Sequence, residues 1–302
     1  MPPHLSEWEL LERLATRVPA TGDDCAVIPH EETFLVWTTD MLWREVDLPQ
    51  GITPYTIGWR AVAVSLSDIA AMGAQPIGAL LALGAPEFEA DLMDGITDGV
   101  LDCCDSINAE YLGGDLSGHS ELTLCSSALG QTPKPIKRRG AQVGDLVGVT
   151  GELGRTAVAL RRFEQGEYDR ANALFRFPPR VAEGQALARY ATSMMDISDG
   201  LARSLHQLAA AGGVGFRVHE REIPVLREVD QLTDDHHERR QMALHTGEDF
   251  ELLFTLSPAD LNEAQRAVSF RIIGDVIDEG MELHSADGVA SLSSRGYEHG
   301  MD

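Results

Sequence analysis

The chain has 302 residues, 43% of them hydrophobic, which is long and apolar enough for one or two hydrophobic cores. Its 48 acidic residues outnumber 24 basic ones, and the net charge of −24 argues against nucleic acid or an anionic membrane as partner. No apolar segment is long enough to cross a bilayer. The N-terminus lacks a signal-peptide pattern and the cysteines lack C-x-x-C spacing. We therefore expect a cytoplasmic enzyme or binding protein.

The acidic excess also resembles the surface of proteins that work in concentrated salt. Only two basic residues are lysines, Lys134 and Lys137. At high ionic strength, screening removes the repulsion among surface carboxylates. We infer a halophile-like acidic surface, on which most aspartates are solvated charges. A functional aspartate must therefore be recognised from its surroundings.

In the first half of the chain, helical and strand patterns alternate. A capping box at Ser6–Glu9 predicts the start of a first helix. Apolar residues 33–39 predict a buried strand that ends at Asp40. Thr53, followed by proline, begins a helix that runs to about Met72. The remaining elements expected here are a strand at 77–84, a helix at about 87–107 and a strand at 109–114 that leads to Asp115.

Residues 132–145 are rich in proline and charge and indicate a domain boundary. We expect an N-terminal domain of residues 1–135 and a C-terminal domain of residues 136–302. The predicted elements of the second half are strands at 146–151, 214–218, 250–256 and 270–277, helices from 154, at 180–190, at 201–211 and after Ser257, and a strand-to-helix junction at 194–200. This alternation of strands and helices predicts a two-domain α/β or α+β fold.

Seven aspartates stand among glycine, serine, threonine and apolar residues instead of among other charges. Any one of them has a structural explanation, because aspartate is common in turns and helix caps. Seven together favour a function, because burying a carboxylate at the end of an apolar strand is costly unless a cation compensates. They are Asp23, Asp24, Asp40, Asp68, Asp115, Asp196 and Asp199.

The types of residue around these aspartates favour magnesium and phosphate. Mg²⁺ takes oxygen ligands, and several carboxylates can converge only if cations offset their repulsion. Nearby hydroxyls and glycines suit the approach of phosphate to the backbone. The chain contains no GxxxxGK[ST], G-x-G-x-x-G, H-E-x-x-H or G-x-S-x-G motif. The pattern therefore predicts an acid-lined, Mg²⁺-dependent phosphate site.

In their order along the chain, the motifs resemble those of the thiamine-monophosphate kinase family. This family belongs to the superfamily of aminoimidazole ribonucleotide synthetase and selenophosphate synthetase. The resemblance covers nearly the whole chain and rests on GDDCAVI, TTDML, SLSDIAAMGAQP, GGD, RRGAQVGD, VTGELG, DISDGLA and GEDFELLF. It implies a homodimer whose N-terminal domains form a β-barrel from strands flanked by helices, a C-terminal α+β domain, and ATP in the cleft between the domains.

The resemblance also implies roles for individual residues. The implied ligands of several Mg²⁺ ions are Asp24, Thr39, Asp40, Asp68, Asp115, Asp196 and Asp199, to which we add the neighbouring hydroxyl of Thr38. Of these, Asp40, Asp115 and Asp199 are expected to act in catalysis. The implied nucleotide contacts are Gly114, Arg138 and Ser198, and the implied substrate contacts are Asp47, Glu248 and Tyr297. The implied reaction is phosphorylation of thiamine monophosphate by ATP to give thiamine diphosphate.

Two motifs depart from the family pattern. Asp47 of WREVDL stands where the family usually has a histidine, and Leu116 and Ser117 replace the usual hydroxyls after GGD. The identity of the phosphate acceptor therefore stays open. Two alternatives remain at this point: an aminoimidazole-ribonucleotide-synthetase-like, ATP-dependent ligase, and a non-catalytic protein that binds a magnesium–nucleotide complex.

Overall fold

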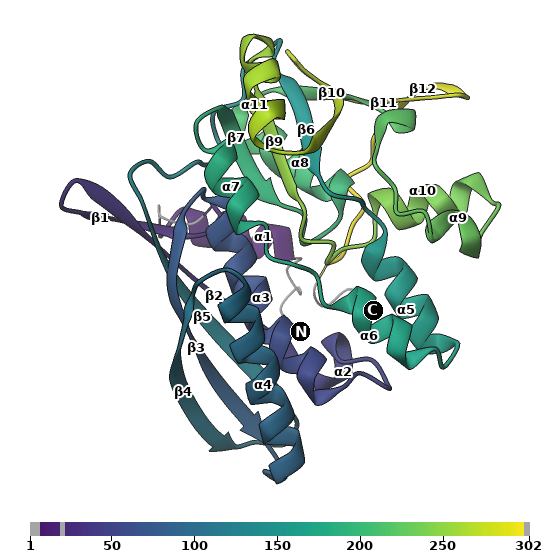
Figure 1. Ribbon diagram of the computed structural model, residues 1–302. Coiled ribbons are helices and arrows are strands. Elements are labelled where there is room, and N and C mark those ends of the chain that lie inside the picture. Colours follow the sequence, from purple (N-terminus) through teal and green to yellow (C-terminus); the bar gives the residue numbers. More distant parts are fainter. Residues whose placement is uncertain (1–6, 19–21, 299–302) are drawn as a thin grey trace.

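The computed structural model describes residues 7–18 and 22–298, and the described chain forms two β-sheets flanked by helices (Figure 1). The elements of the first half are α1 (Glu7–Ala15), β1 (Ala26–His30), β2 (Thr33–Trp43), α2 (Arg44–Asp47), α3 (Pro54–Ala71), β3 (Gln75–Ala85), α4 (Ala90–Ser106), β4 (Glu110–Gly118) and β5 (Thr123–Thr132). None of the described helices is both long and apolar enough to span a membrane.

The second half contains the larger sheet. Its elements are β6 (Leu146–Thr150), α5 (Arg155–Glu164), α6 (Tyr168–Phe175), α7 (Val181–Leu187), β7 (Ala191–Asp196), α8 (Leu201–Gly212), β8 (Gly215–His219), a 3₁₀ turn (Glu220–Glu222), α9 (Val229–Leu232), α10 (His236–Leu244), β9 (Leu252–Leu256), a second 3₁₀ turn (Pro258–Asp260), α11 (Leu261–Ala267), β10 (Phe270–Ile277), β11 (Met281–Ser285) and β12 (Gly288–Ser291). The strands lie in the order β12-β11-β8-β10-β6-β9-β7.

The N-terminal sheet has the strand order β1-β2-β5-β3-β4 and two different faces. On the inner face, β2 residues such as Val36 and Leu42 are buried against α3. The alternate residues Trp37 and Met41 lie on the outer face, where they are 52% and 61% exposed. Successive side chains of a strand point to opposite faces, so β2 contributes side chains to both faces of the sheet.

Helix α3 is the central helix of the molecule. Nearly all of its residues are buried, including polar Ser65 and Ser67. It packs against β2, β5 and β3 of the N-terminal sheet and also contacts β7 and α7 of the second half. Thr53 caps the helix, as the sequence predicts, by accepting a hydrogen bond from the Thr56 N–H. A helix that is apolar on all sides is buried on all sides, and α3 follows that rule.

The hydrophobic cores of the two halves interlock. Phe177 and Phe250 of the second half pack into the core of the N-terminal sheet. Ala70 and Ala71 of α3 pack in turn among residues of β7 and β9. The two sheets divide the chain between residues 132 and 146, inside the proline-rich boundary segment. Whether residues 1–135 and 136–302 are independent folding units stays a prediction.

Most of the elements expected from local sequence patterns are present, with shifted ends. The strand expected at 33–39 continues through Asp40 to Trp43, because β5 pairs with it along its whole length. The sequence patterns missed β1, β11, β12 and also β5, the middle strand of the N-terminal sheet. They also missed the short helices α2, α6, α9 and α10. Helix α1 is present from Glu7. Ser6 of the expected capping box lies outside the described residues.

Two glycines allow α3 and α4 to approach closely. A Cβ atom on Gly58 of α3 would lie 1.9 Å from the carbonyl oxygen of Ile96, and one on Gly99 of α4 would lie 2.0 Å from that of Tyr55. Real Cβ atoms do not approach a backbone oxygen so closely. The close contact between the two helices therefore depends on glycine, which has no side chain, at both positions.

We expect Gly58→Ala to lower the free energy of unfolding by about 1–3 kcal/mol, the usual cost of overpacking, although alanine favours a helix more than glycine does. Urea denaturation measures the change. Gly118→Ala is the control, because a Cβ there meets no atom within 4 Å. Equal stability of the two variants would contradict this account of the α3–α4 contact.

Candidate active site

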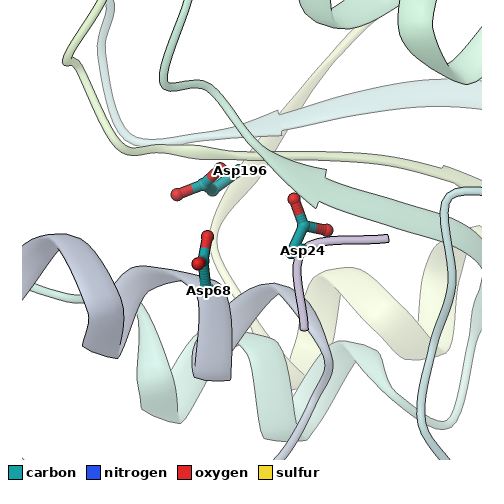
Figure 2. Close-up of side chains that lie close together, drawn as sticks. All are labelled: Asp24, Asp68 and Asp196. Atoms are coloured by element: carbon teal, nitrogen blue, oxygen red, sulfur yellow. The ribbon is translucent and has the colours of Figure 1, made fainter. Parts of the chain in front are cut away.

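Three aspartates from separate segments of the chain converge at one point. Asp24 precedes β1, Asp68 lies on α3, and Asp196 is the last residue of β7. One carboxylate oxygen of each lies within 4.8 Å of those of the other two. Figure 2 shows the three side chains pointing toward one another. We refer to these three residues as the carboxylate cluster, which joins the two halves of the chain.

Hydroxyl groups orient two members of the carboxylate cluster. The Ser67 hydroxyl donates to Asp196 Oδ2 at 2.6 Å, and the Thr38 hydroxyl donates to Asp68 Oδ2 at 2.5 Å. Hydrogen bonds from neutral hydroxyls satisfy single lone pairs of a carboxylate and leave its charge in place. These hydrogen bonds therefore fix the orientation of the two carboxylates but supply no positive charge to offset theirs.

Asp40 extends this acidic region along the inner face of β2. Its Oδ2 accepts a hydrogen bond from the Ser65 hydroxyl at 2.6 Å. Through their strand partners, Asp40 and Gly114 belong to one row across the sheet, on the inner face. The Asp40 charge is close enough to Asp68 to raise the pKa of Asp68.

Arg138 is the only cation that contacts the carboxylate cluster among the described residues. Its Nη2 lies 2.6 Å from Asp24 Oδ1, and its backbone N–H donates to Asp23. The other Asp24 oxygen, Oδ2, is buried without a hydrogen-bond partner among the described residues. Such a buried carboxylate oxygen is costly unless a cation or donor approaches it.

Burial is the largest cause that raises the pKa of each of the four central aspartates, Asp24, Asp40, Asp68 and Asp196. It raises the pKa of Asp68 well above its ordinary value and that of Asp196 to about 8, and mutual repulsion adds to both. The four carboxylates therefore resist full ionisation together. Oxygen ligands with uncompensated charge, including an orphaned buried oxygen, fit hard divalent cations such as Mg²⁺.

A pocket of about 540 Å³ lies beside Asp40 and receives side chains from both halves; we refer to it as the central pocket. Its acidic lining residues are Asp40, Asp47, Asp199 and Glu248. Its large apolar lining residues include Leu42, Val46, Val64, Leu160, Phe175 and Phe250. Apolar walls with a few charged groups are typical of small-molecule sites, and these charges favour a cationic or metal-associated ligand.

The loop after β7 forms one side of the central pocket. Ser198 and Asp199 line it, and Gly200 at φ +98° begins α8. The Asp199 carbonyl accepts a hydrogen bond from the Tyr297 N–H at 3.0 Å, which holds the C-terminal segment against the pocket. The Asp199 carboxylate lies 3.6 Å from Arg203 Nε on α8. The sequence prediction of a strand-to-helix junction here is confirmed.

The three acids of the GEDFE motif have different surroundings. Glu248 lines the central pocket and pairs with buried Arg60 at 2.5 Å. Asp249 is buried and accepts hydrogen bonds from two N–H groups at the start of α5, and burial raises its pKa to about 7. Glu251 forms a buried pair with Arg180 at 2.5 Å. Only Glu248 is in contact with the space where a ligand fits.

Asp47, one of the predicted substrate contacts, is the last residue of the short helix α2. Its Oδ2 accepts a hydrogen bond from the Trp43 N–H at 2.8 Å across α2. The same side chain lines the central pocket. Asp47 therefore both accepts a hydrogen bond within its own helical turn and borders the central pocket.

Asp115 and Thr39 lie away from the carboxylate cluster. Asp115 pairs with Ala82, which pairs with Cys125, which pairs with Met41, so these residues form one row across the sheet. That row is on the outer face, opposite Asp40. Thr39, which precedes Asp40 in β2, also belongs to the outer side and donates its hydroxyl to the Ser126 carbonyl. Their expected roles as metal ligands stay predictions.

Sequence patterns missed Arg60, Ser65 and His245, which the structure places at the site. Arg60 carried the clearest signal, because it is the only basic residue of a largely apolar helix and must find a partner if buried. His245 lines the central pocket and contacts the Arg295 carbonyl through Nδ1. Nothing local in the sequence indicates that last contact, because the two residues lie fifty positions apart.

Both halves of the chain match models of one protein family. Residues 22–132 match the AIR synthase related protein, N-terminal domain, and residues 142–284 match the AIR synthase related protein, C-terminal domain. The matched ranges contain all members of the carboxylate cluster. They also contain both sheets, apart from β12 and the last residue of β11. The fold and the site thus define the class as AIR synthase related.

Full-length relatives narrow this class. The thiamine-monophosphate kinase of Halobacterium salinarum is 44% identical over 301 residues, 98% of this chain and 100% of that protein. The solved structure of AaThiL complexed with AMPPCP and TMP has a TM-score of 0.90 at 27% identity and covers 99% of both chains. The Stenotrophomonas maltophilia thiamine-monophosphate kinase structure has a TM-score of 0.79 at 32% identity, covering 95% of this chain and 98% of that one. The chain belongs to the thiamine-monophosphate kinase family.

The raised pKa values of the central aspartates predict how stability depends on pH. A folded-state pKa above the unfolded value of about 3.9 means that the folded protein binds more protons than the unfolded one, so stability falls as pH rises. For Asp196 that window ends at about pH 8. In EDTA, we expect the free energy of unfolding to fall between pH 5 and pH 8.

Asp68→Asn should flatten this pH dependence, because it removes one of the repelling carboxylates. Urea denaturation at pH 5, 6.5 and 8 measures the slope. Asp98→Asn, at an exposed position of α4, removes the same formal charge elsewhere. Equal slopes in the two variants would show that the carboxylate cluster does not cause the effect.

Proposed function

We propose that this protein transfers the γ-phosphoryl group of ATP to the phosphate of thiamine monophosphate, giving thiamine diphosphate. Membership of the thiamine-monophosphate kinase family supports the reaction. The structural observation that supports this reaction is that the two sites adjoin at Asp40. The Ser65 hydroxyl of α3 donates to the Asp40 carboxylate, whose charge acts on Asp68 of the carboxylate cluster, and Asp40 also lines the central pocket. A phosphoryl donor held at the cluster therefore lies next to an acceptor held in the pocket.

The central pocket suits thiamine monophosphate. The thiazolium ring of thiamine monophosphate is flat and cationic, and Phe175 and Phe250 offer apolar aromatic walls to it. Glu248 and Asp47 supply negative charge for the cation at this side. An acid at position 47, in place of the family's usual histidine, is compatible with a cationic acceptor because one of its oxygens is held by the Trp43 N–H.

Several Mg²⁺ ions belong to this proposal, and the residues present fit them. Asp24, Asp40, Asp68 and Asp196 would hold them, with Thr38 and Asp199 nearby. Bound Mg²⁺ would neutralise charge on the phosphates during transfer.

The protein's own residues then have little covalent chemistry to perform. The nucleophile is an ionised phosphate oxygen and needs no general base. Ser65 and Ser67 orient carboxylates, Arg138 contributes a fixed positive charge, and the apolar walls of the pocket limit access of water. Catalysis therefore depends on positioning and charge neutralisation.

Removing one carboxylate charge at Asp40 should stop turnover while the fold persists. We expect Asp40→Asn to lower kcat by about a hundredfold or more, equivalent to ~2.7 kcal/mol, because the amide is a poor Mg²⁺ ligand. ADP release at saturating Mg²⁺, with and without thiamine monophosphate, measures it. The control Asp98→Asn should stay near wild type. For the wild-type protein, ADP release that does not depend on thiamine monophosphate would point to the ligase alternative, and no ADP release would point to a non-catalytic binder.

A homodimer through the outer face of the N-terminal sheet is a second part of the proposal. Trp37, Met41 and Leu80 expose apolar side chains on that face, and Asp115 lies among them. An exposed apolar sheet face of this kind commonly marks a protein interface. A second copy of the chain would cover this face. We also keep a cytoplasmic location as part of the proposal.

We expect Leu80→Glu to convert the dimer to a monomer, because a carboxylate would be buried in an apolar interface. Light scattering after size-exclusion chromatography gives the mass. Leu101→Glu changes an equally exposed leucine on α4 and should leave the dimer intact. A wild-type monomer, or the same mass for both variants, would contradict this interface.

A further inference from the structure

Arg60 is buried at the junction between the two halves. Its side chain is 0% exposed and lies on α3, among the core residues of the first half. Its Nη2 donates to Glu248 Oε1 at 2.5 Å, and its Nη1 donates to the Phe175 carbonyl at 3.2 Å. Both partners belong to the second half and both residues line the central pocket.

Stacking fixes the orientation of the Arg60 guanidinium. Its central carbon lies 3.7 Å from the ring centroid of Phe175 and 5.7 Å from that of Phe177. Its Nε has no hydrogen-bond partner among the described residues. A planar guanidinium held by one ring and two acceptors has little rotational freedom. The group is therefore a rigid support for whatever it contacts.

Glu248 is held in an uncommon backbone conformation. Its φ is +67°, in the left-handed region that residues with a side chain rarely adopt. Its N–H donates to the Ser198 carbonyl at 2.6 Å, and its carbonyl accepts from the Thr156 hydroxyl at 2.7 Å. Such a conformation persists where surrounding contacts over-determine it, and it occurs often at ligand sites. The backbone thus aims the Glu248 side chain, and Arg60 holds its carboxylate.

The two Glu248 oxygens have different surroundings. Oε1 accepts the hydrogen bond from Arg60, and Oε2 has no hydrogen-bond partner among the described residues. The side chain remains 28% exposed, although Arg60 is fully buried behind it. An occupant of the central pocket can therefore meet the carboxylate but not the guanidinium.

Arg60 also shares its helix with the carboxylate cluster. Ser65, Ser67 and Asp68 follow on α3 within little more than two turns. The two serines donate hydrogen bonds to carboxylates of the acidic site, and Asp68 belongs to the carboxylate cluster. One helix thereby fixes the pocket carboxylate and the phosphate site relative to each other. Small errors in the distance between two reactants are costly in rate, because transfer requires near-contact geometry.

We propose that Arg60 is a positioning residue for the phosphate acceptor: it holds the Glu248 carboxylate in the central pocket so that the cationic part of the acceptor is bound in register with the carboxylate cluster. This rests on the function proposed above. A purely structural role makes a different prediction: loss of one partner of the ion pair would lower stability and affect both substrates alike. Only the positioning role requires a selective effect on the acceptor.

The test compares three single variants, Arg60→Met, Arg60→Lys and Glu248→Gln. It also includes the double variant that combines Arg60→Met with Glu248→Gln. Arg176→Met is the matched control, since Arg176 likewise stacks over an aromatic ring, Tyr55, and donates to Thr56 of α3. KM for thiamine monophosphate, KM for ATP and kcat are measured for each. Calorimetric titration with thiamine monophosphate gives its Kd directly.

We expect Arg60→Met to raise the KM and Kd for thiamine monophosphate about tenfold, with the KM for ATP within about twofold of wild type. Arg60→Lys should recover part of the loss, because lysine keeps the charge but not the planar fork. In the Glu248→Gln background, Arg60→Met should raise the KM and Kd for thiamine monophosphate by less than about twofold more, because the two residues act together. Arg176→Met should leave both KM values unchanged.

Equal rises in both KM values, or an unchanged acceptor KM and Kd, would overturn the proposal while the kinase function stands. If Arg60→Met does not fold, Glu248→Gln and Arg60→Lys decide: a wild-type acceptor KM in both overturns it, and a selective rise in both supports it. If the wild-type protein neither binds thiamine monophosphate nor releases ADP with it, the proposed function fails and this inference fails with it.

Discussion

The repulsion between buried carboxylates is the constraint on which the rest of the structure depends. Asp24, Asp68 and Asp196 come from three segments and would separate if only their own charges acted. Arg138 offsets one charge, and hydroxyls hold the others without neutralising them. The energy that keeps them together comes from the cores that interlock around α3. The apolar packing thus maintains an electrostatically unfavourable site that is ready for cations and phosphate.

The two halves contribute differently to the site. The N-terminal sheet and α3 contribute Thr38, Asp40, Ser65, Ser67 and Asp68 from regular elements. The second half contributes Asp196 at the end of β7 and loop residues that include Ser198, Asp199 and Glu248. Loops placed on a rigid scaffold commonly carry binding residues, because the scaffold fixes their ends. The turn at Glu248 and the loop at Ser198 are also bonded to each other through the backbone. They therefore act as one unit against α3.

Local patterns predicted β2, α3 and the junction after β7, because strands, caps and apolar runs are set by neighbouring residues. They placed the end of β2 at Asp40, where a carboxylate interrupts an apolar run. The strand continues because β5 pairs with it as far as Trp43, and Ser65 of α3 donates a hydrogen bond to the Asp40 carboxylate. No short stretch of sequence contains either contact. The opposite faces of Asp40 and Asp115 depend on strand pairing and on irregular register in β3 and β4. Convergence and separation are therefore properties of the tertiary structure.

Strand β2 carries consecutive residues with opposite duties, since Asp40 faces the inner acidic region and Met41 faces outward. Its two-residue periodicity makes this segment intolerant of single insertions and deletions. One added residue before Asp40 would turn the carboxylate to the outer surface and move Met41 to the inner face. Both surfaces would be lost in a single step. Length variation in this protein family should therefore concentrate in the loops around β2, with the strand itself kept at constant length.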